Sequence, residues 1–248
     1  MRYYILKTDV DPIVVGVTHG AGQFTGSKNY SELNVWTNEV MLQSKNNYRV
    51  WAEHILYAPK PHYGLLLEKK AKKTDYIGDN NMRGFYVNEK LKSILESCHL
   101  PNHRFIPTTI IEEKTGNENN EYYRFVYDME TGEHTVNFAK CEYDLKRHKQ
   151  NFGSDFEIAI NNYEDYMQVF YDTGSAVKVS KLVLNKKFDN ELDLFGCQFL
   201  TLETSYISER LKQKIEAANI TGCKILAVDS GRMLAELLGE KVVEIVFE

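Results

Sequence analysis

Two hexapeptides set the expectation for how this chain folds: VNEKLK at residues 87–92 and ISERLK at residues 207–212. The offset between them is 120 residues, and the same offset continues without a gap as far as Phe105 and Ile225. Matched or similar residues at six consecutive positions in one register indicate a structural unit that the chain uses twice. Two copies are too few for a solenoid.

Each hexapeptide has the pattern of a helix that begins directly after a strand. Asn88 and Ser208 are residue types preferred at helix N-caps, and the glutamate after each lies at the positive end of the helix dipole. Apolar residues follow at helical spacing and form one stripe per helix. These stripes comprise Leu91, Ile94, Leu95 and Cys98 in the first copy and Leu211, Ile215 and Ala218 in the second. Asn219 and Gly222 suit a left-handed turn before an apolar strand at residues 224–228.

The predicted fold class is therefore α+β, with mixed or antiparallel sheets and a strand-helix-strand unit used twice. Other elements follow from β-branched and aromatic runs and from helix caps such as Asn162 and Ser230. Strands are expected at residues 3–7, 177–184 and 242–247, helices at residues 161–171 and 230–238, and a glycine-rich loop at residues 16–26. A polar stretch at residues 112–121 predicts two α+β halves, residues 1–115 and 116–248, or one continuous domain.

Composition and charge indicate which broad classes of protein this chain fits. The 248 residues are 43% hydrophobic and 26% charged, which is ordinary for a globular chain. The net charge of -5 argues against nucleic-acid binding, because phosphate contacts need a basic surface. No apolar run reaches the roughly 18 residues of a membrane helix, and the first residues do not resemble a signal peptide. The four cysteines are far apart without a Cys-x-x-Cys pair, which favours reduced thiols and a cytoplasmic location.

No motif in the sequence predicts catalysis, a cofactor or a metal. The glycine-rich residues 19–26 lack the spacing of a phosphate-binding loop. Cys98, His99 and His103 are close in sequence, but Pro101 breaks the helix between them and no second ligand cluster lies near. The serines lack a G-x-S-x-G elbow, and the acidic pair at residues 112–113 borders a polar loop. The chain is therefore expected not to be an enzyme.

A tyrosine-rich and acidic segment is the predicted partner-binding surface. Residues 122–127 and 135–138 have the pattern of two strands, and turn formers at residues 128–133 join them as a predicted hairpin. Aromatic anchors inside an acidic rim suit the binding of a basic protein surface, while an ordinary solvated hairpin is the alternative interpretation. The candidate residues are Tyr122, Tyr123, Tyr127, Asp128, Glu130 and Glu133.

The second copy of the repeat resembles immunity protein family eleven, a family of bacterial immunity proteins first described as a domain of unknown function. Residues 206–212 and 220–225 are similar to the hallmark near the end of that family. Further similar features are the Tyr-Tyr-Ile-Leu strand at residues 3–6, the Lys-Leu-x-Leu strand at residues 181–184 and the Asp-Leu-Phe step at residues 193–195. The resemblance is best over residues 160–228. In the first copy, asparagine and lysine replace the family's usual serine and arginine.

The resemblance implies a function in bacterial competition. A member of this family protects its cell by binding a cognate protein toxin of a polymorphic-toxin system, and the family is regarded as non-enzymatic. The expected partner is therefore a protein toxin, neither nucleic acid nor a membrane. Two alternatives remain open: an enzyme whose catalytic residues are scattered in the sequence, and an adaptor module of a secretion apparatus.

Overall fold

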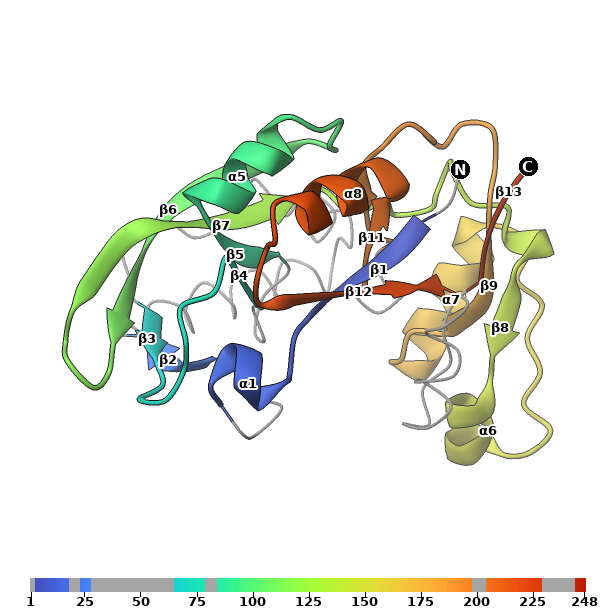
Figure 1. Ribbon diagram of the computed structural model, residues 1–248. Helices are drawn as coiled ribbons and strands as arrows, with labels where there is room; N and C mark the ends of the chain where they lie inside the picture. Colours follow the sequence, from blue (N-terminus) through green and yellow to red (C-terminus); the bar gives the residue numbers. More distant parts are fainter. Residues whose placement is uncertain (1–2, 18–22, 28–64, 79–83, 198–203, 229–243) are drawn as a thin grey trace.

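The structure of the protein, a computed structural model, describes residues 3–17, 23–27, 65–78, 84–197, 204–228 and 244–248. Its fold is α+β, with helices and with strands in mixed and antiparallel sheets (Figure 1). The predicted α+β class with mixed or antiparallel sheets is thus confirmed. None of the helices within these ranges has the length and apolarity needed to span a bilayer.

A four-stranded antiparallel sheet joins the two ends of the chain. Its strand order is β10-β11-β1-β12. The strands are β1 (Tyr3–Thr8), β10 (Leu194–Phe195), β11 (Ser205–Ser208) and β12 (Cys223–Ala227). Helix α8 (Glu209–Ala217) connects β11 to β12. The predicted strand at residues 3–7 is confirmed, and its partners come from more than 190 residues further along the chain.

A six-stranded mixed sheet forms the largest layer, in the order β2-β3-β6-β7-β5-β4. Only the β3–β6 pair among these described strands is parallel. The strands are β2 (Phe24–Ser27), β3 (Leu65–Leu67), β4 (Tyr76–Gly78), β5 (Phe85–Asn88), β6 (His103–Glu112) and β7 (Glu118–Tyr127). Helix α5 (Glu89–Glu96) connects β5 to β6, and the short helix α1 (Pro12–Val15) follows β1.

A smaller lobe lies at the opposite end of the molecule from β2 and β3 (Figure 1). Its three-stranded sheet has the order β13-β9-β8. The elements are the 3-10 helix η1 (Phe138–Lys140), β8 (Glu142–Asp144), α6 (Lys146–Phe152), α7 (Tyr163–Thr173), β9 (Lys178–Leu184) and β13 (Glu244–Phe247). The predicted helix capped by Asn162 is confirmed, because the Asn162 side chain accepts a hydrogen bond from the backbone N–H of Asp165.

Helices α5 and α8 lie side by side over the two larger sheets (Figure 1). As predicted, Asn88 and Ser208 are their N-caps and accept hydrogen bonds from the backbone N–H groups of Leu91 and Leu211. The apolar stripes of both helices face inward. Leu91, Leu95, Leu211 and Ile215 are all buried in one cluster with side chains from β1, β5, β7 and β11.

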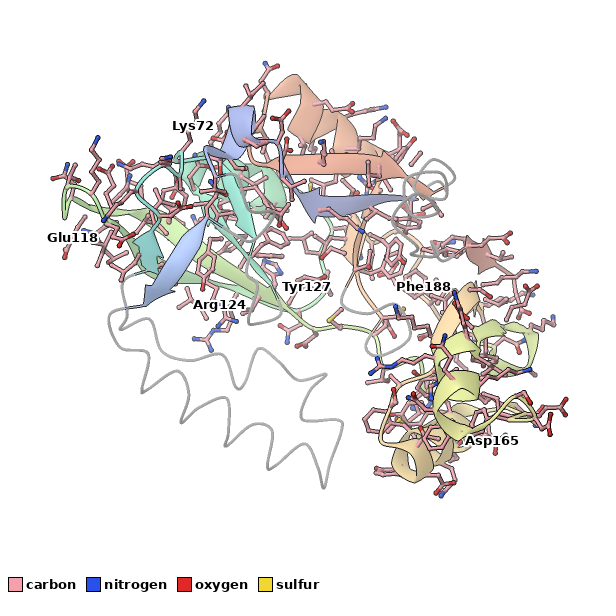
Figure 2. All side chains as sticks on the ribbon, turned by 90° about the horizontal axis from the view of Figure 1, so that it is seen from below. Lys72, Glu118, Arg124, Tyr127, Asp165 and Phe188 are labelled. Atoms are coloured by element: carbon pink, nitrogen blue, oxygen red, sulfur yellow. The ribbon has the colours of Figure 1, made fainter. Side chains whose placement is uncertain are left out.

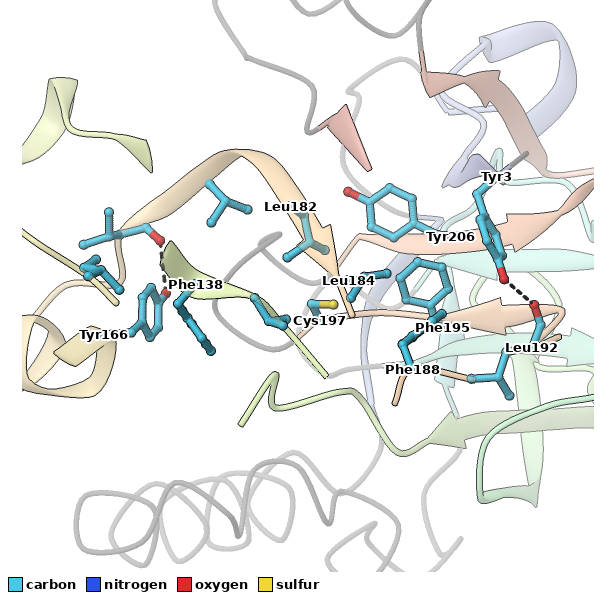
Figure 3. Close-up of a cluster of buried hydrophobic side chains, with 14 of the residues drawn as sticks. Tyr3, Phe138, Tyr166, Leu182, Leu184, Phe188, Leu192, Phe195, Cys197 and Tyr206 are labelled. Atoms are coloured by element: carbon cyan, nitrogen blue, oxygen red, sulfur yellow. Dashed lines mark hydrogen bonds between the residues drawn. The ribbon is translucent and has the colours of Figure 1, made fainter. Parts of the chain in front are cut away.

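Side chains on β1 alternate between the two faces of its sheet, so the strand contacts both the cluster beneath α5 and α8, here called the central core, and the lobe. Tyr4 and Leu6 point into the core beneath α5 and α8, whereas Tyr3 and Ile5 point to the other face of the sheet. There they join a second cluster that includes Phe195 and extends into the lobe (Figure 3). The Tyr3 ring meets the Phe195 ring edge-on at 4.9 Å, and the Tyr3 hydroxyl donates to the carbonyl of Leu192 at 3.1 Å. The lobe is therefore packed onto the sheet and not merely tethered to it.

The predicted hairpin around residues 128–133 is wrong. Strand β7 pairs along its length with β6, and the turn between them is closed by the Glu112 N–H bonding to the Asn117 carbonyl at 2.9 Å. Residues after Tyr127 leave the sheet instead of returning along it: the Glu130 N–H donates to Gly196 and Val136 forms a bridge with Leu184. Strand β6 contains Pro107, although proline is disfavoured inside paired strands.

Other expectations had mixed outcomes. Strand β9 and the last described strand, β13, confirm two predicted strands, but β2 begins within residues 16–26, which were predicted to be loop. The polar stretch at residues 112–121 was predicted to be loop as well, yet β7 begins at Glu118. The predicted helix at residues 230–238 and residues 18–22 of the glycine-rich stretch lie outside the described residues. The predicted boundary at residues 115–116 falls in the turn between two paired strands.

Candidate interaction surface

The three tyrosines predicted to bind a partner do not share one face. Tyr122 and Tyr123 alternate on opposite faces of β7. Tyr122 is buried and its hydroxyl donates to the Thr74 carbonyl at 2.8 Å. Tyr127 is also buried and shares a hydrogen bond of 2.7 Å with the Ser205 hydroxyl. Only Tyr123 remains partly exposed, so the structure does not gather these rings on one surface.

The three predicted acids lie in the segment that joins β7 to the lobe. Asp128 accepts a hydrogen bond from the Asn102 side-chain amide at 2.9 Å. Glu130 accepts one from the Thr135 hydroxyl at 2.8 Å, and Glu133 is 3.9 Å from a ring nitrogen of His134. Two of these carboxylates therefore hold the path of the connecting segment, and replacing them would alter the fold as well as the surface charge.

The outer face of the helix pair carries two similar ion-pair clusters. Lys92 lies 4.8 Å from the ring centre of Tyr123 and bonds Glu89 and Glu96 on its own helix. On α8, Lys212 is 4.4 Å from the ring centre of Tyr4 and is paired with Glu209 and Glu216, the counterparts of the α5 acids. Each cluster has one lysine and two glutamates, which leaves one net negative charge. Such exposed pairs contribute little stability.

Asp193 is the centre of the densest polar cluster among the described residues. Its carboxylate is fully buried and accepts hydrogen bonds from the Ser208 hydroxyl at 2.5 Å, from the Arg210 guanidinium at 2.9 Å and from the His99 backbone N–H at 2.9 Å. The Ser208 hydroxyl also caps α8, and the His99 ring bonds Asp189 at 2.8 Å instead of Ser208. Within the described ranges no histidine contacts the Ser208 hydroxyl, and its partner Asp193 is already paired with Arg210. The cluster therefore ties elements together and differs from a serine activated by a histidine.

The protonation of Asp193 links this cluster to pH. Burial raises the pKa of Asp193, but hydrogen bonds from Arg210, Ser208 and His99 outweigh it and leave the pKa below its ordinary value. A carboxyl with a lowered pKa stabilises the fold above its unfolded-state pKa of about 3.9 and loses that contribution as the pH falls through the folded-state value. We expect the stability difference between the parent and Asp193→Asn to shrink below about pH 4. Urea unfolding of both proteins across this range measures it, and a constant difference would contradict the expectation.

The cysteine and histidines considered as metal ligands point to separate partners. The Cys98 thiol lies 3.2 Å from the Ile94 carbonyl, the His99 ring bonds Asp189, and the His103 ring is 2.8 Å from the Pro101 carbonyl. Within the described ranges, no three His, Cys, Asp or Glu side chains are arranged to hold a metal ion.

An exposed aromatic strip on the lobe was missed by sequence reasoning. Helix α6 presents Phe152, which is 49% exposed although it is a large apolar side chain. Its ring is 5.5 Å from the Phe156 ring, and both stack against His148, with ring centres 6.1 and 5.6 Å from the His148 ring. We call Phe152, Phe156 and His148 the aromatic strip. The three rings are four residues apart in the sequence, a spacing that places neighbouring side chains on the same side of a helix. This spacing was the feature from which the strip could have been predicted.

The buried His148 ring fixes the position of the strip, and exposed cations lie on the same helix. His148 is buried, and one ring nitrogen lies 3.3 Å from the Ser175 carbonyl and 3.4 Å from the Thr173 hydroxyl, at the end of α7. Gly153 then ends α6 with a φ of 107°, a conformation that glycine adopts readily. The exposed cations on α6 are Lys146, Arg147 and Lys149. Helix α6 itself carries no acidic residue, while Asp155 and Glu157 flank Phe156.

No protein-family model matches the chain, and no curated protein is similar to it. The resemblance to immunity protein family eleven therefore rests on the quoted residues alone.

Proposed function

We propose that this protein binds a cognate bacterial toxin and neutralises it by covering the toxin's functional surface. The family resemblance motivates the choice of partner. The observation that carries the proposal is the aromatic strip, because a half-exposed phenylalanine stacked on a fixed partner ring is the kind of side chain that anchors a protein interface.

The position of the strip suits a binding role. It lies on a lobe that is packed onto the larger sheets through buried aromatic contacts (Figure 3). Binding residues are commonly carried on loops and short elements that a rigid frame positions. The Phe152 and Phe156 rings stack against the buried His148 ring. They therefore have little side-chain freedom left to lose on binding.

Charge selects one class of surface on the toxin. Lys146, Arg147 and Lys149 give the α6 side of the strip three positive charges, whereas Asp155 and Glu157 flank Phe156 at its other end. We assign the α6 side of the strip to an acidic face of the toxin that contains an apolar pocket for Phe152. Opposite charges speed the encounter and the buried ring slows dissociation. This assignment replaces the acidic tyrosine hairpin as our candidate for the interface.

A growth assay tests the proposed function. A candidate toxin, chosen from the genes adjacent to that of this protein, is expressed from an inducible promoter, with or without this protein in the same cell. We expect growth to stop on induction and to continue when this protein is present. If growth is the same in both cultures while both proteins accumulate, this toxin is not the partner; if direct mixing of the purified proteins also shows no complex, the proposal fails.

Phe152→Asp tests the interface within that assay. Removing an aromatic anchor costs about 2 kcal/mol or more, which corresponds to at least roughly 30-fold weaker binding. We expect the variant to keep the parent's thermal midpoint and to lose affinity for the toxin in calorimetry. Ile13→Asp is the matched control, since Ile13 is 79% exposed on α1, away from the lobe. Equal affinity of the two variants would remove the strip from the interface.

A further inference from the structure

We propose that the chain is a tandem duplication whose two copies have exchanged their first strands. The first copy contributes β1, β4, β5, α5 and β6, and the second contributes β7, β10, β11, α8 and β12, in the same order along the chain. In the fold, β1 lies in the sheet of the second copy and β7 lies in the sheet of the first.

The two sheets have the same strand order. The order β4-β5-β7-β6 in the six-stranded sheet corresponds to β10-β11-β1-β12 in the four-stranded sheet, and all of these pairs are antiparallel. The exchanged strands share a tyrosine pair, in YYILKT of β1 and in YYRFVY at the end of β7, and the two pairs are 119 residues apart.

The register of the exchanged strands is the same in both sheets. Val87 lies opposite Tyr123, and its counterpart Ile207 lies opposite Tyr4. On the other side, Phe105 pairs with Phe125 as Ile225 pairs with Leu6. A shift of one residue would reverse every side chain, so agreement on both edges is a specific match.

Hydrogen bonds outside the ladders also repeat between the copies, with corresponding residues 118 to 120 positions apart. The Tyr122 hydroxyl donates to the carbonyl of Thr74, and the Tyr3 hydroxyl donates to that of Leu192. The first residue after each exchanged strand donates its backbone N–H to the carbonyl of the residue just before the neighbouring strand, β6 or β12. These bonds are Asp128 to Asn102 at 2.8 Å and Asp9 to Gly222 at 2.9 Å.

Two aspartates occupy corresponding positions in the two copies, and the carboxylate of each accepts a hydrogen bond from the other copy. The Asp75 and Asp193 carbonyls accept from the N-cap residues Asn88 and Ser208 of their own copies. Their carboxylates bond the turn after the other copy's helix: Asp75 accepts from the Thr221 N–H at 2.8 Å, as Asp193 does from the His99 N–H. This reciprocal contact is what an exchanged pair of equivalent units produces.

The spacing along the chain favours exchanged tandem copies over a circularly permuted second unit. Between the first and second strands of the unit, the chain runs from Tyr3 to Tyr76 in one copy and from Tyr122 to Leu194 in the other. These separations are nearly equal, which a permutation does not require. The copies differ in that intervening segment: the first holds α1, β2 and β3, whereas the second holds the lobe with α6 and α7.

A pair of engineered cysteines distinguishes exchanged from unexchanged strands. Lys7 of β1 lies opposite Lys224 of β12, and both side chains are exposed. In an unexchanged chain Lys7 would take the place of Val126, opposite the exposed Arg104. Opposed residues in antiparallel strands are within disulfide range. The full chain is prepared as Lys7→Cys with Lys224→Cys and, as the matched control, Lys7→Cys with Arg104→Cys, both with Cys98→Ser and Cys223→Ser.

After mild oxidation, peptide mapping should find the 7–224 crosslink in most molecules and no 7–104 crosslink. The reverse pattern overturns the exchange, and so does the absence of both crosslinks from a folded protein. A second measurement uses a protease site inserted after Gly116, where a side chain meets nothing within 4 Å. Cleavage there should leave two fragments that elute together under native conditions and separate in denaturant. Separation under native conditions contradicts the proposal.

Discussion

Asp193→Ala lowers the free energy of unfolding by about 3 kcal/mol or more, because a buried hydroxyl and a part-buried backbone N–H lose their acceptor. The Ser208 hydroxyl and the His99 backbone N–H both bond this carboxylate, and Ser208 is almost fully buried. Arg210 adds less, since half of its side chain is exposed and water can replace the lost partner. For a chain of this size the expected fall in thermal midpoint is about 6–12 °C, measured by calorimetry.

Asp189→Ala is the matched control for Asp193→Ala. Asp189 bonds the His99 ring at 2.8 Å, but both side chains are about half exposed, so its removal should cost no more than about 1 kcal/mol. The two aspartates are close together and differ mainly in burial. Equal destabilisation by the two substitutions would show that the buried hydrogen bonds of Asp193 contribute nothing specific.

Leu211→Ala is expected to destabilise the protein by about 2–5 kcal/mol, the range for leucine truncation in a packed core. Leu211 is fully buried beneath α8, and Leu91 occupies the corresponding position beneath α5. Both side chains belong to the same central cluster. Leu91→Ala should therefore lower the free energy of unfolding by a similar amount, within about 1 kcal/mol. Urea unfolding measures both values, provided that the dependence of the free energy on urea concentration is the same in the variants and the parent.

The exposed Glu216 on α8 provides the control for the leucine truncations. Glu216→Ala leaves the core intact and should change the free energy of unfolding by no more than about 0.5 kcal/mol. A small effect of Leu211→Ala, close to that of Glu216→Ala, would contradict its place in the core. A large difference between Leu91→Ala and Leu211→Ala would argue against equivalent environments for the two helices.

The local parts of the fold were readable from the sequence. Caps at Asn88, Ser208 and Asn162, and the left-handed turn at Asn219 with a φ of 50°, depend on neighbours within a few residues. Burial of the helix stripes also followed from their spacing. The pairing of strands did not, because strand partners far apart in sequence leave no local signal: β7 was joined to the wrong neighbour, and the partners of β1 could not be named.

The candidate surface was less predictable than the fold. Tyrosines in an acidic stretch looked exposed, but alternation along β7 and contact with Thr74 and Ser205 bury two of the three. One ring that the fold does expose, Phe152, lies in a stretch that carried no predicted element. Whether an aromatic ring is buried depends on what packs against it from elsewhere in the chain, and that contact is tertiary.

The exchange of first strands also governs the order in which the protein can fold during synthesis. Strand β1 is made first, yet Tyr4 is separated by 205 residues from its partner Glu209 on α8. At translation rates of about 5–20 residues per second, β1 waits on the order of 10–40 s for its sheet. Throughout that time its apolar side chains and open edges are available for wrong pairing. Folding is therefore expected to finish only after α8 and β12 emerge, and to depend on protection of the early strand until then.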